Sequence, residues 1–183
     1  MQDLIVEKPY RFVPPTKCKI VVWLTCKFSL FRYWLRSVEG ICEFEVINAE
    51  KITDSIRANH GIVLAGNHCR NADPMAIGEV AKAADSYFYS MASWHLFNQD
   101  WFMRWAIPQL GGFSINREGV DRTALEFAIN VLATAERPLV IFPEGSVSRS
   151  NDYLQPFLGG TGFIARSAAR RRKKRNANSK VVI

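Results

Sequence analysis

The sequence predicts an α/β protein, in which short buried strands alternate with helices and form a mixed or parallel sheet. Residues 61–66 and 138–142 are short apolar runs bounded by Gly or Pro, a pattern typical of buried strands. Longer segments with helical periodicity separate such runs, and this alternation favours the α/β class. The chain has 183 residues, of which 48% are hydrophobic and 22% charged, so it can form one globular domain with a sizeable core.

The first 40 residues differ from the rest. Residues 1–17 contain three prolines and are expected to be irregular, and they resemble neither a signal peptide nor a transit peptide. Residues 18–38 are very apolar and are expected to form a helix, although the longest uncharged run, 20–26, is too short to span a bilayer. Four polar side chains fall at helical spacing among aromatic ones: Thr25, Ser29, Arg32 and Arg36. A basic, aromatic helix suits a membrane interface, and the alternative is an amphipathic helix packed on the core.

Strands and helices follow one another through the rest of the chain. Alternating polar and apolar residues predict a strand at 41–47. Further strands are expected at residues 61–66, 86–92, 138–142 and 181–183, with a strand or turn at 111–117. A helical turn is expected at residues 54–59, and helices are expected at residues 74–84, 100–110, 123–135 and 162–175. No internal repeat is visible, so we expect an N-terminal arm with an interfacial helix, residues 1–40, and one domain, residues 41–183.

Charge and cysteine content restrict the kind of partner. The formal net charge of +7 implies an anionic partner: nucleic acid, a phospholipid surface or a phosphorylated substrate. The four Cys residues form no C-x-x-C pair, so neither a zinc site nor a disulfide framework is indicated. We expect free thiols in a reducing compartment, no metal and no cofactor.

The stretch GIVLAGNHCRNAD, residues 61–73, carries the first candidate for chemistry. A polar loop follows the buried strand, and Asp73 with Pro74 predicts a helix start in which Asp is the N-cap. Open α/β sheets place ligands at such a position. His68 and Asp73 would point roughly 140° apart on one helix, so they meet only if the segment bends between strand and helix. The Asp73 carboxylate would then fix the imidazole tautomer, and the other ring nitrogen could take a proton from a hydroxyl.

The spacing of His68 and Asp73 is weak evidence by itself, because His95 and Asp100 repeat it. No apolar run flanked by Gly leads directly into the second pair, and no Asp-Pro helix start follows it. We therefore interpret the second pair as a chance match.

Three loops that follow apolar runs carry related motifs: NHCRNAD at 67–73, GGFSINR at 111–117 and FPEGSVSR at 142–149. In this order and at these intervals they resemble the signature blocks of the glycerophospholipid (PlsC-like) acyltransferases, a family that includes the lysophosphatidate (1-acylglycerol-3-phosphate) acyltransferases. The resemblance covers roughly residues 40–165. It implies a glycerol-3-phosphate acyltransferase-like mixed sheet flanked by helices, with residues 41–183 as the acyltransferase domain.

The resemblance also implies roles for individual residues. His68 would be the general base and Asp73 its orienting partner. Arg117 would hold the phosphate of the acceptor. The acceptor site would be completed by the other matching positions: Asn67, Glu144, Gly145, Ser146 and Arg149.

The implied reaction moves a fatty acyl group from acyl-CoA or acyl-carrier protein to the hydroxyl of a lysophospholipid, with lysophosphatidate first among acceptors. We expect direct transfer without an acyl-enzyme. Because Cys69 directly follows His68, their side chains should diverge, so no Cys-His dyad is expected.

Some positions depart from the family pattern and bear on the identity of the acceptor. Arg70 stands where Ser is frequent, and Ser114 and Asn116 stand where Phe and Asp are usual. Val147 stands where Arg is usual, although Arg149 is near enough to substitute. A fourth block, an apolar strand with a central Pro, should follow residues 181–183, so the sequence is compatible with a truncated domain.

We expect a peripheral protein on the cytoplasmic face of a membrane, and there are two alternative functions. One is a non-catalytic protein of the same fold that binds anionic lipid. The other is nucleic-acid binding, which is not expected because no such motif occurs and the cations cluster at 170–175. That run is either a solvated helix end or a contact for anionic head groups. Each site residue could also have a purely structural role. The alternatives are a His68 whose hydrogen bonds are satisfied within the protein, an Asp73 that is only an N-cap, an Arg117 in a surface ion pair, a Glu144 that caps a loop and an Arg149 in solvent.

Overall fold

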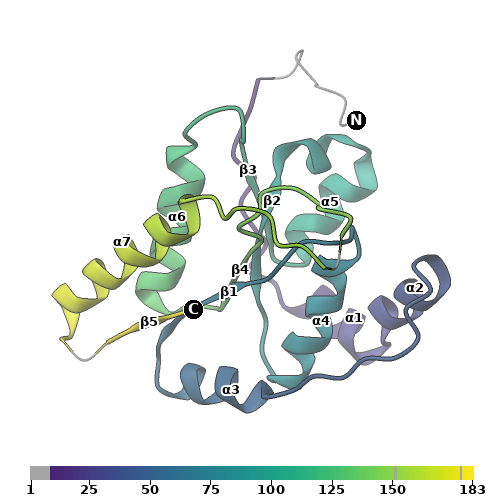
Figure 1. Cartoon of the computed structure of the whole chain (residues 1–183), viewed down its shortest axis with the longest axis horizontal. Helices are drawn as coiled ribbons and strands as arrows, with labels where there is room; N and C mark the ends of the chain where they lie inside the picture. The colour runs from purple at the N-terminus through teal and green to yellow at the C-terminus, as the bar shows by residue number, and fades with distance from the viewer. Residues whose placement is uncertain (1–8, 151, 178) are drawn as a thin grey trace.

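A five-stranded sheet lies between two groups of helices in the computed structural model, which describes residues 9–150, 152–177 and 179–183 (Figure 1). The N-terminal half contains α1 (Ile20–Lys27), α2 (Leu30–Val38), α3 (Ala49–Arg57), β1 (Gly61–Ala65), α4 (Asp73–Ala83), β2 (Tyr89–Ser93) and the 3₁₀ helix η1 (Trp94–Asn98). The C-terminal half contains α5 (Trp101–Gln109), β3 (Gly112–Ile115), α6 (Arg122–Thr134), β4 (Leu139–Ile141), α7 (Gly160–Arg175) and β5 (Val181–Val182). The α/β class and most of the expected elements are present.

The strand order is β3-β2-β4-β1-β5, and every pairing among the described residues is parallel. Val63 lies beside Leu139 and Ala65 beside Ile141 in the central pair. Of the two sheet types that the sequence allowed, mixed and parallel, the described part of the sheet is parallel. In a parallel sheet the carboxyl ends of all strands share one edge, so the loops that carry the three motifs emerge together.

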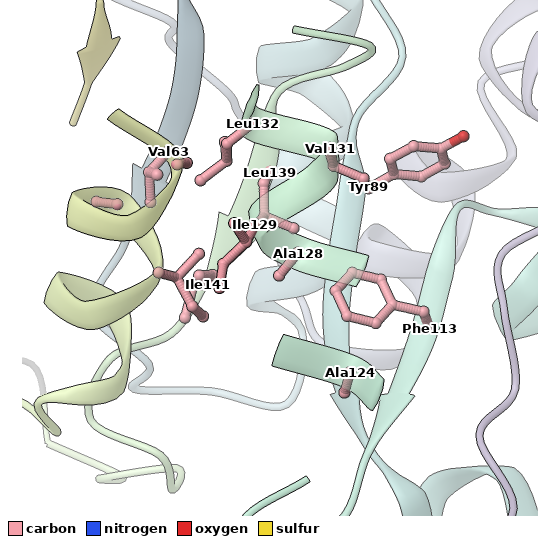
Figure 2. Packing of buried hydrophobic residues seen from close by; sticks show 13 residues of the cluster. Val63, Tyr89, Phe113, Ala124, Ala128, Ile129, Val131, Leu132, Leu139 and Ile141 are labelled. Atoms are coloured by element: carbon pink, nitrogen blue, oxygen red, sulfur yellow. The ribbon is translucent and has the colours of Figure 1, made fainter. Parts of the chain in front are cut away.

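Successive side chains of the central strands enter two cores on opposite faces of the sheet, because the side-chain period of a strand is two. One core lies between the sheet and helices α6 and α7. It contains Val63, Leu139 and Ile141 of the strands, which Figure 2 shows near Ile129 of α6. Val140 belongs to the second cluster, which α3 and α4 cover. The alternation of these side chains fixes the register of the strands, and hence the position of the loops beyond them.

Gly61 is required where β1 passes the end of α6. A Cβ atom at this position would lie 2.3 Å from the carbonyl oxygen of Leu132, which is part of the backbone and cannot rotate away. Only glycine therefore allows the start of β1 to approach α6 this closely.

The prediction of a strand at 41–47 is wrong, because residues 41–48 form neither helix nor strand. Alternation predicts which side chains could face a core, but a strand also needs a neighbouring backbone to bond with. The edge of β1 is taken by β5, whose Val181 and Val182 pair with Gly61 and Ile62. Residues 41–48 instead connect α2 with α3, which begins at Ala49 and not at 54.

The helix expected at 18–38 is divided into α1 and α2 at Ser29, whose φ is 52°. Leu35 is fully buried, and Arg32 of the expected polar stripe forms an ion pair of 2.9 Å with the buried Glu79 of α4. The opposite side of the two helices leaves large apolar side chains exposed, among them Trp23, Phe28, Leu30 and Tyr33. The helices are thus both packed on the domain and apolar on their outer face.

The N-terminal arm, residues 9–16, has no helix or strand but is fixed along β3. The Val13 amide donates to Ser114 Oγ (2.8 Å), and the Ser114 amide donates to the Val13 carbonyl (3.0 Å). The Tyr10 hydroxyl donates to Asp121, and burial together with this hydrogen bond raises the pKa of Tyr10 to about 12. Asp121 also accepts from the Asn116 amide (3.0 Å), so the arm supports the loop that carries Arg117.

The basic run at 170–175 is not uniformly solvated. Arg172 is 3% exposed and donates to the carbonyls of Leu132, Ala133 and Asn59, which closes the carboxyl end of α6. Burial, followed by the charge of Arg175, lowers the pKa of Arg172. Its neighbour Arg171 is partly exposed and donates to both carboxylate oxygens of Glu126 through Nη1 and Nη2. At least Arg172 is therefore a structural residue, which the sequence did not indicate.

Candidate active site

The candidate site is built on the His68 loop at the carboxyl end of β1. His68 Nδ1 lies 2.9 Å from Asp73 Oδ2, so the segment bends as the sequence required. Asp73 is the first residue of α4, not its N-cap, and the same Oδ2 atom accepts a hydrogen bond from the Arg70 amide (2.9 Å). With two partners on one oxygen, the carboxylate is held in place and holds the imidazole in turn.

The imidazole of His68 is oriented on a second side by an aromatic ring. Phe142, at the end of β4, stacks on it with ring centroids 4.2 Å apart and planes inclined by 22°. The side chain of His68 is 16% exposed. No described residue forms a hydrogen bond with Nε2, so this nitrogen is available to a hydroxyl of a substrate.

Glu144 joins the His68 loop to the loop after β4. It is buried, its Oε1 accepts from the His68 amide (2.8 Å), and its Oε2 accepts from the Gln155 amide (3.2 Å). The Ser148 amide adds a third link by donating to the His68 carbonyl (2.7 Å). Glu144 therefore links the backbone of the two loops. The Ser148 link had no signal in the sequence, because a main-chain donor is independent of residue type.

Arg117 and Gly145 lie close to each other. Gly145 has a φ of +70°, and a Cβ atom there would lie 2.5 Å from the Leu158 side chain and 3.8 Å from Arg117 Nη2. The Arg117 side chain is exposed and has no ion pair within the described residues, so it can receive an anion. Asn67 and Ser146 are exposed on the two adjoining loops, and no hydrogen bond joins either of them to another described residue.

Arg149 lies on a shallow pocket of about 270 Å³ beside the His68 loop. The lining residues of this pocket come from three segments of the chain: Glu39, Cys69, Arg70, Asn71, Val147 and Arg149. The Cys69 thiol lies 3.9 Å from Asp73 Oδ1. Among the described residues, no group of three His, Cys, Asp or Glu side chains could hold a metal ion.

The second His-x4-Asp match has no comparable geometry. His95 Nε2 lies 3.8 Å from Glu118 Oε1, whereas Asp100 caps α5 by accepting from the Met103 amide (2.7 Å). The two side chains therefore have separate partners, which agrees with their interpretation as a chance match.

Comparison with known proteins identifies the family of the chain. Residues 43–183 match the family described as Acyltransferase. The chain belongs to the acyltransferase family. It is 32% identical over 134 residues to the 1-acyl-sn-glycerol-3-phosphate acyltransferase of Streptococcus pneumoniae (strain ATCC BAA-255 / R6). The match covers 73% of this chain and 46% of that protein, so the chain spans about half the length of this curated relative.

Membership of the acyltransferase family confirms the resemblance noted in the three motifs. The structure brings His68, Asp73 and Glu144 into one hydrogen-bonded group, with Arg117 and Gly145 beside each other and Arg149 on the adjoining pocket. The hydroxyl of the buried Ser114 accepts a hydrogen bond from the Val13 amide, so it is used to hold the N-terminal arm.

Replacing Glu144 with Gln is expected to lower the kcat of acyl transfer about tenfold, since a neutral amide can accept only one of the two backbone hydrogen bonds well. The Gln amide group would face the second backbone N–H and loosen the His68 loop. Steady-state kinetics beside Glu118→Gln, an exposed control, measures the effect. A kcat equal to that of the control would show that the link between the loops is dispensable.

Proposed function

We propose that this protein transfers a fatty acyl group from a thioester donor, acyl-CoA or acyl-carrier protein, to the hydroxyl of a lysophospholipid. Lysophosphatidate is the preferred acceptor, in line with the name of the pneumococcal relative. The observation that carries the proposal is the 2.9 Å contact between His68 Nδ1 and Asp73 Oδ2 at the carboxyl edge of a parallel sheet. With Nδ1 protonated toward the carboxylate, Nε2 is the basic nitrogen.

In the proposed step, Nε2 of His68 takes the proton of the acceptor hydroxyl while its oxygen attacks the thioester carbonyl. The tetrahedral intermediate carries an oxyanion and needs hydrogen-bond donors. The amides of Cys69 and Asn71 are candidates, because neither has a hydrogen-bond partner among the described residues. Collapse expels the thiolate, which takes the proton from His68, and the ester is formed without a covalent enzyme intermediate.

Arg117 is proposed to bind the phosphate of the acceptor. A guanidinium can grip phosphate through two parallel hydrogen bonds, which orients the acceptor as well as attracting it. Gly145 keeps the space beside Arg117 Nη2 clear of a side chain. The loop that carries Arg117 is held by Asp121, so its position is set by the N-terminal arm and by α6.

We propose that the outer face of α1 and α2 binds the membrane surface. Trp23 is 48% exposed, Phe28 63% and Tyr33 75%, and Lys27 Nζ lies 4.5 Å from the centre of the Trp23 ring. Aromatic rings with nearby cations suit the boundary between head groups and acyl chains. None of the helices described is long and apolar enough to cross a membrane.

Replacing both Trp23 and Phe28 with Ser is expected to weaken binding to anionic phospholipid vesicles about tenfold or more, because each ring transfers apolar surface out of water. Vesicle co-sedimentation measures the binding. Ile47→Ser is the matched control, since Ile47 is 70% exposed in the segment between α2 and α3. Equal binding by the double variant and the control would exclude these helices as the membrane contact.

The proposed function is tested by acyl transfer in mixed liposomes, with product identified by mass spectrometry. Palmitoyl-CoA and palmitoyl-acyl-carrier protein are each offered with lysophosphatidate, glycerol 3-phosphate and a neutral lysolipid. Acylated lysophosphatidate as the main product is expected. Vesicle binding without any product would instead favour a lipid-binding protein of the same fold.

A further inference from the structure

We infer that α5 forms a second membrane-binding surface, separate from the outer face of α1 and α2. Trp101 is 80% exposed, Phe102 52% and Trp105 50%. The ring centroids of Trp101 and Phe102 are 6.1 Å apart, as are those of Phe102 and Trp105, so the three rings form one cluster. We call these residues, together with Arg104, the α5 surface. The inference rests on the proposed function, which places the lipid substrate in a membrane.

The α5 surface faces away from the rest of the protein. Trp101 and Trp105 are four residues apart, so they lie on the same side of the helix. Ala106 is turned inward and is buried. Ile107 lies against Gly112 of β3, where an added Cβ atom would come within 2.4 Å of the Ile107 side chain. A contiguous group of large apolar side chains on the exposed side of a helix marks an interaction surface.

The composition of α5 favours a lipid surface as the partner. Arg104 is the only charged residue of the helix; it is exposed and forms no ion pair with a described residue. The Asp100 carboxylate is held at the start of the helix, where it accepts from the Met103 amide. Trp side chains concentrate at the boundary between head groups and acyl chains, and a neighbouring cation attracts anionic head groups. The net charge of +7 acts in the same direction.

The α5 surface lies on the same side of the sheet as α1 and α2 (Figure 1). Val140 pairs with Ser90 and Ser90 with Gly112, so these three positions point to one face of the sheet. On this face Val140 packs in the cluster that α4 covers, and Gly112 lies against Ile107 of α5. Helix α2 packs on α4 through the ion pair described above. A shared side is what one bilayer needs in order to contact both surfaces.

The α5 surface also lies toward the edge of the sheet that carries the candidate active site. The 3₁₀ helix η1 directly follows the carboxyl end of β2 and leads into α5 at Trp101. The other end of α5 returns to the opposite edge, where a Cβ atom at Gly111 would lie 2.5 Å from the carbonyl oxygen of Phe88, just before β2. The His68 loop follows the carboxyl end of β1, at the same edge as Trp101. Contact through the α5 surface would therefore hold this edge near the lipid.

Binding to vesicles of phosphatidylcholine and phosphatidylglycerol tests the surface. The double variant Trp101→Ser/Trp105→Ser is expected to bind about tenfold more weakly than wild type, because two rings no longer leave water. Ile47→Ser should bind as wild type does. Arg104→Gln is expected to weaken binding about fivefold on these vesicles and to change nothing on phosphatidylcholine alone. Equal binding by the double variant and the Ile47→Ser control would overturn the inference.

Tryptophan fluorescence with brominated acyl chains gives a readout that does not depend on weakened binding. Trp101→Phe/Trp105→Phe keeps aromatic rings on the surface but removes two fluorophores, so the quenched fraction of the emission should fall. Trp94→Phe is the control and should raise that fraction, because Trp94 packs between Tyr10 and Phe97 and stays out of the lipid. A quenched fraction that does not fall in the double Phe variant would place these rings outside the bilayer and overturn the inference.

Both measurements are independent of turnover. Vesicle binding that depends on the α5 surface, without any acyl transfer, would refute the proposed enzyme activity and leave this inference standing. Analytical ultracentrifugation without lipid tests the competing occupant, a second copy of the chain. A wild-type dimer that Trp101→Ser/Trp105→Ser converts to a monomer would overturn the inference, whereas the same mass for both proteins supports it.

Discussion

Replacing His68 with Ala is expected to lower the kcat of acyl transfer by about 10²–10⁴-fold, the usual contribution of a positioned general base. Folding should be retained, because the bonds that anchor this residue to Glu144 and Ser148 use its backbone atoms. Removing the ring costs its contacts with Asp73 and Phe142 but no backbone hydrogen bond. Initial rates at saturating donor and acceptor measure the effect.

His95→Ala is the matched control for this variant, since it removes the histidine of the second His-x4-Asp match. It is expected to keep a near-normal kcat, because His95 contacts only the exposed Glu118 among charged partners in the described residues. Thermal unfolding of both variants shows whether lost activity reflects lost structure. A His68→Ala protein with a wild-type rate would rule out His68 as the base.

Replacing Arg172 with Met is expected to lower the free energy of unfolding by about 3 kcal/mol, because buried carbonyl oxygens lose their donors. For a chain of this size that corresponds to a fall in Tm of roughly 6–12 °C. The three carbonyls belong to Leu132, Ala133 and Asn59, so the damage falls where α6 meets the start of β1. Methionine keeps most of the side-chain volume, so the loss of hydrogen bonds dominates.

Arg171→Met is the control for this stability measurement, as it removes an adjacent arginine of the same helix. Its ion pair with Glu126 is partly exposed and is expected to be worth less than about 1 kcal/mol. Denaturant unfolding of both variants, followed by circular dichroism, gives the two free energies. Equal destabilisation would mean that the buried carbonyls find water when Arg172 is absent.

The elements that sequence reasoning located well have local signals. The apolar run of β1 and the periodic helix α6 lie within a residue or two of their expected bounds. The contact between His68 and Asp73 was also predictable, because glycine and an Asp-Pro pair indicate a bend between strand and helix. These features depend on neighbouring residues alone.

The features that were missed depend on distant parts of the chain. The strand expected at 41–47 has the right alternation, but the edge of β1 that it could have joined is occupied by β5. Arg172 looks like its neighbours in a basic run, and only the docking of α7 on α6 shows which arginine is buried. Glu144 likewise gains its role from two amides, one of them 76 residues away.

The contact of Tyr10 with Asp121 has a practical consequence for how the proposed acceptor preference is measured. Asp121 also bonds the backbone of Asn116, next to Arg117, so a change near residue 10 reaches the proposed phosphate contact without touching substrate. An affinity tag or a shortened N-terminus that shifts Tyr10 would then alter the apparent ranking of lysolipids. Acceptor profiles should accordingly be compared only between proteins that share the same first residues.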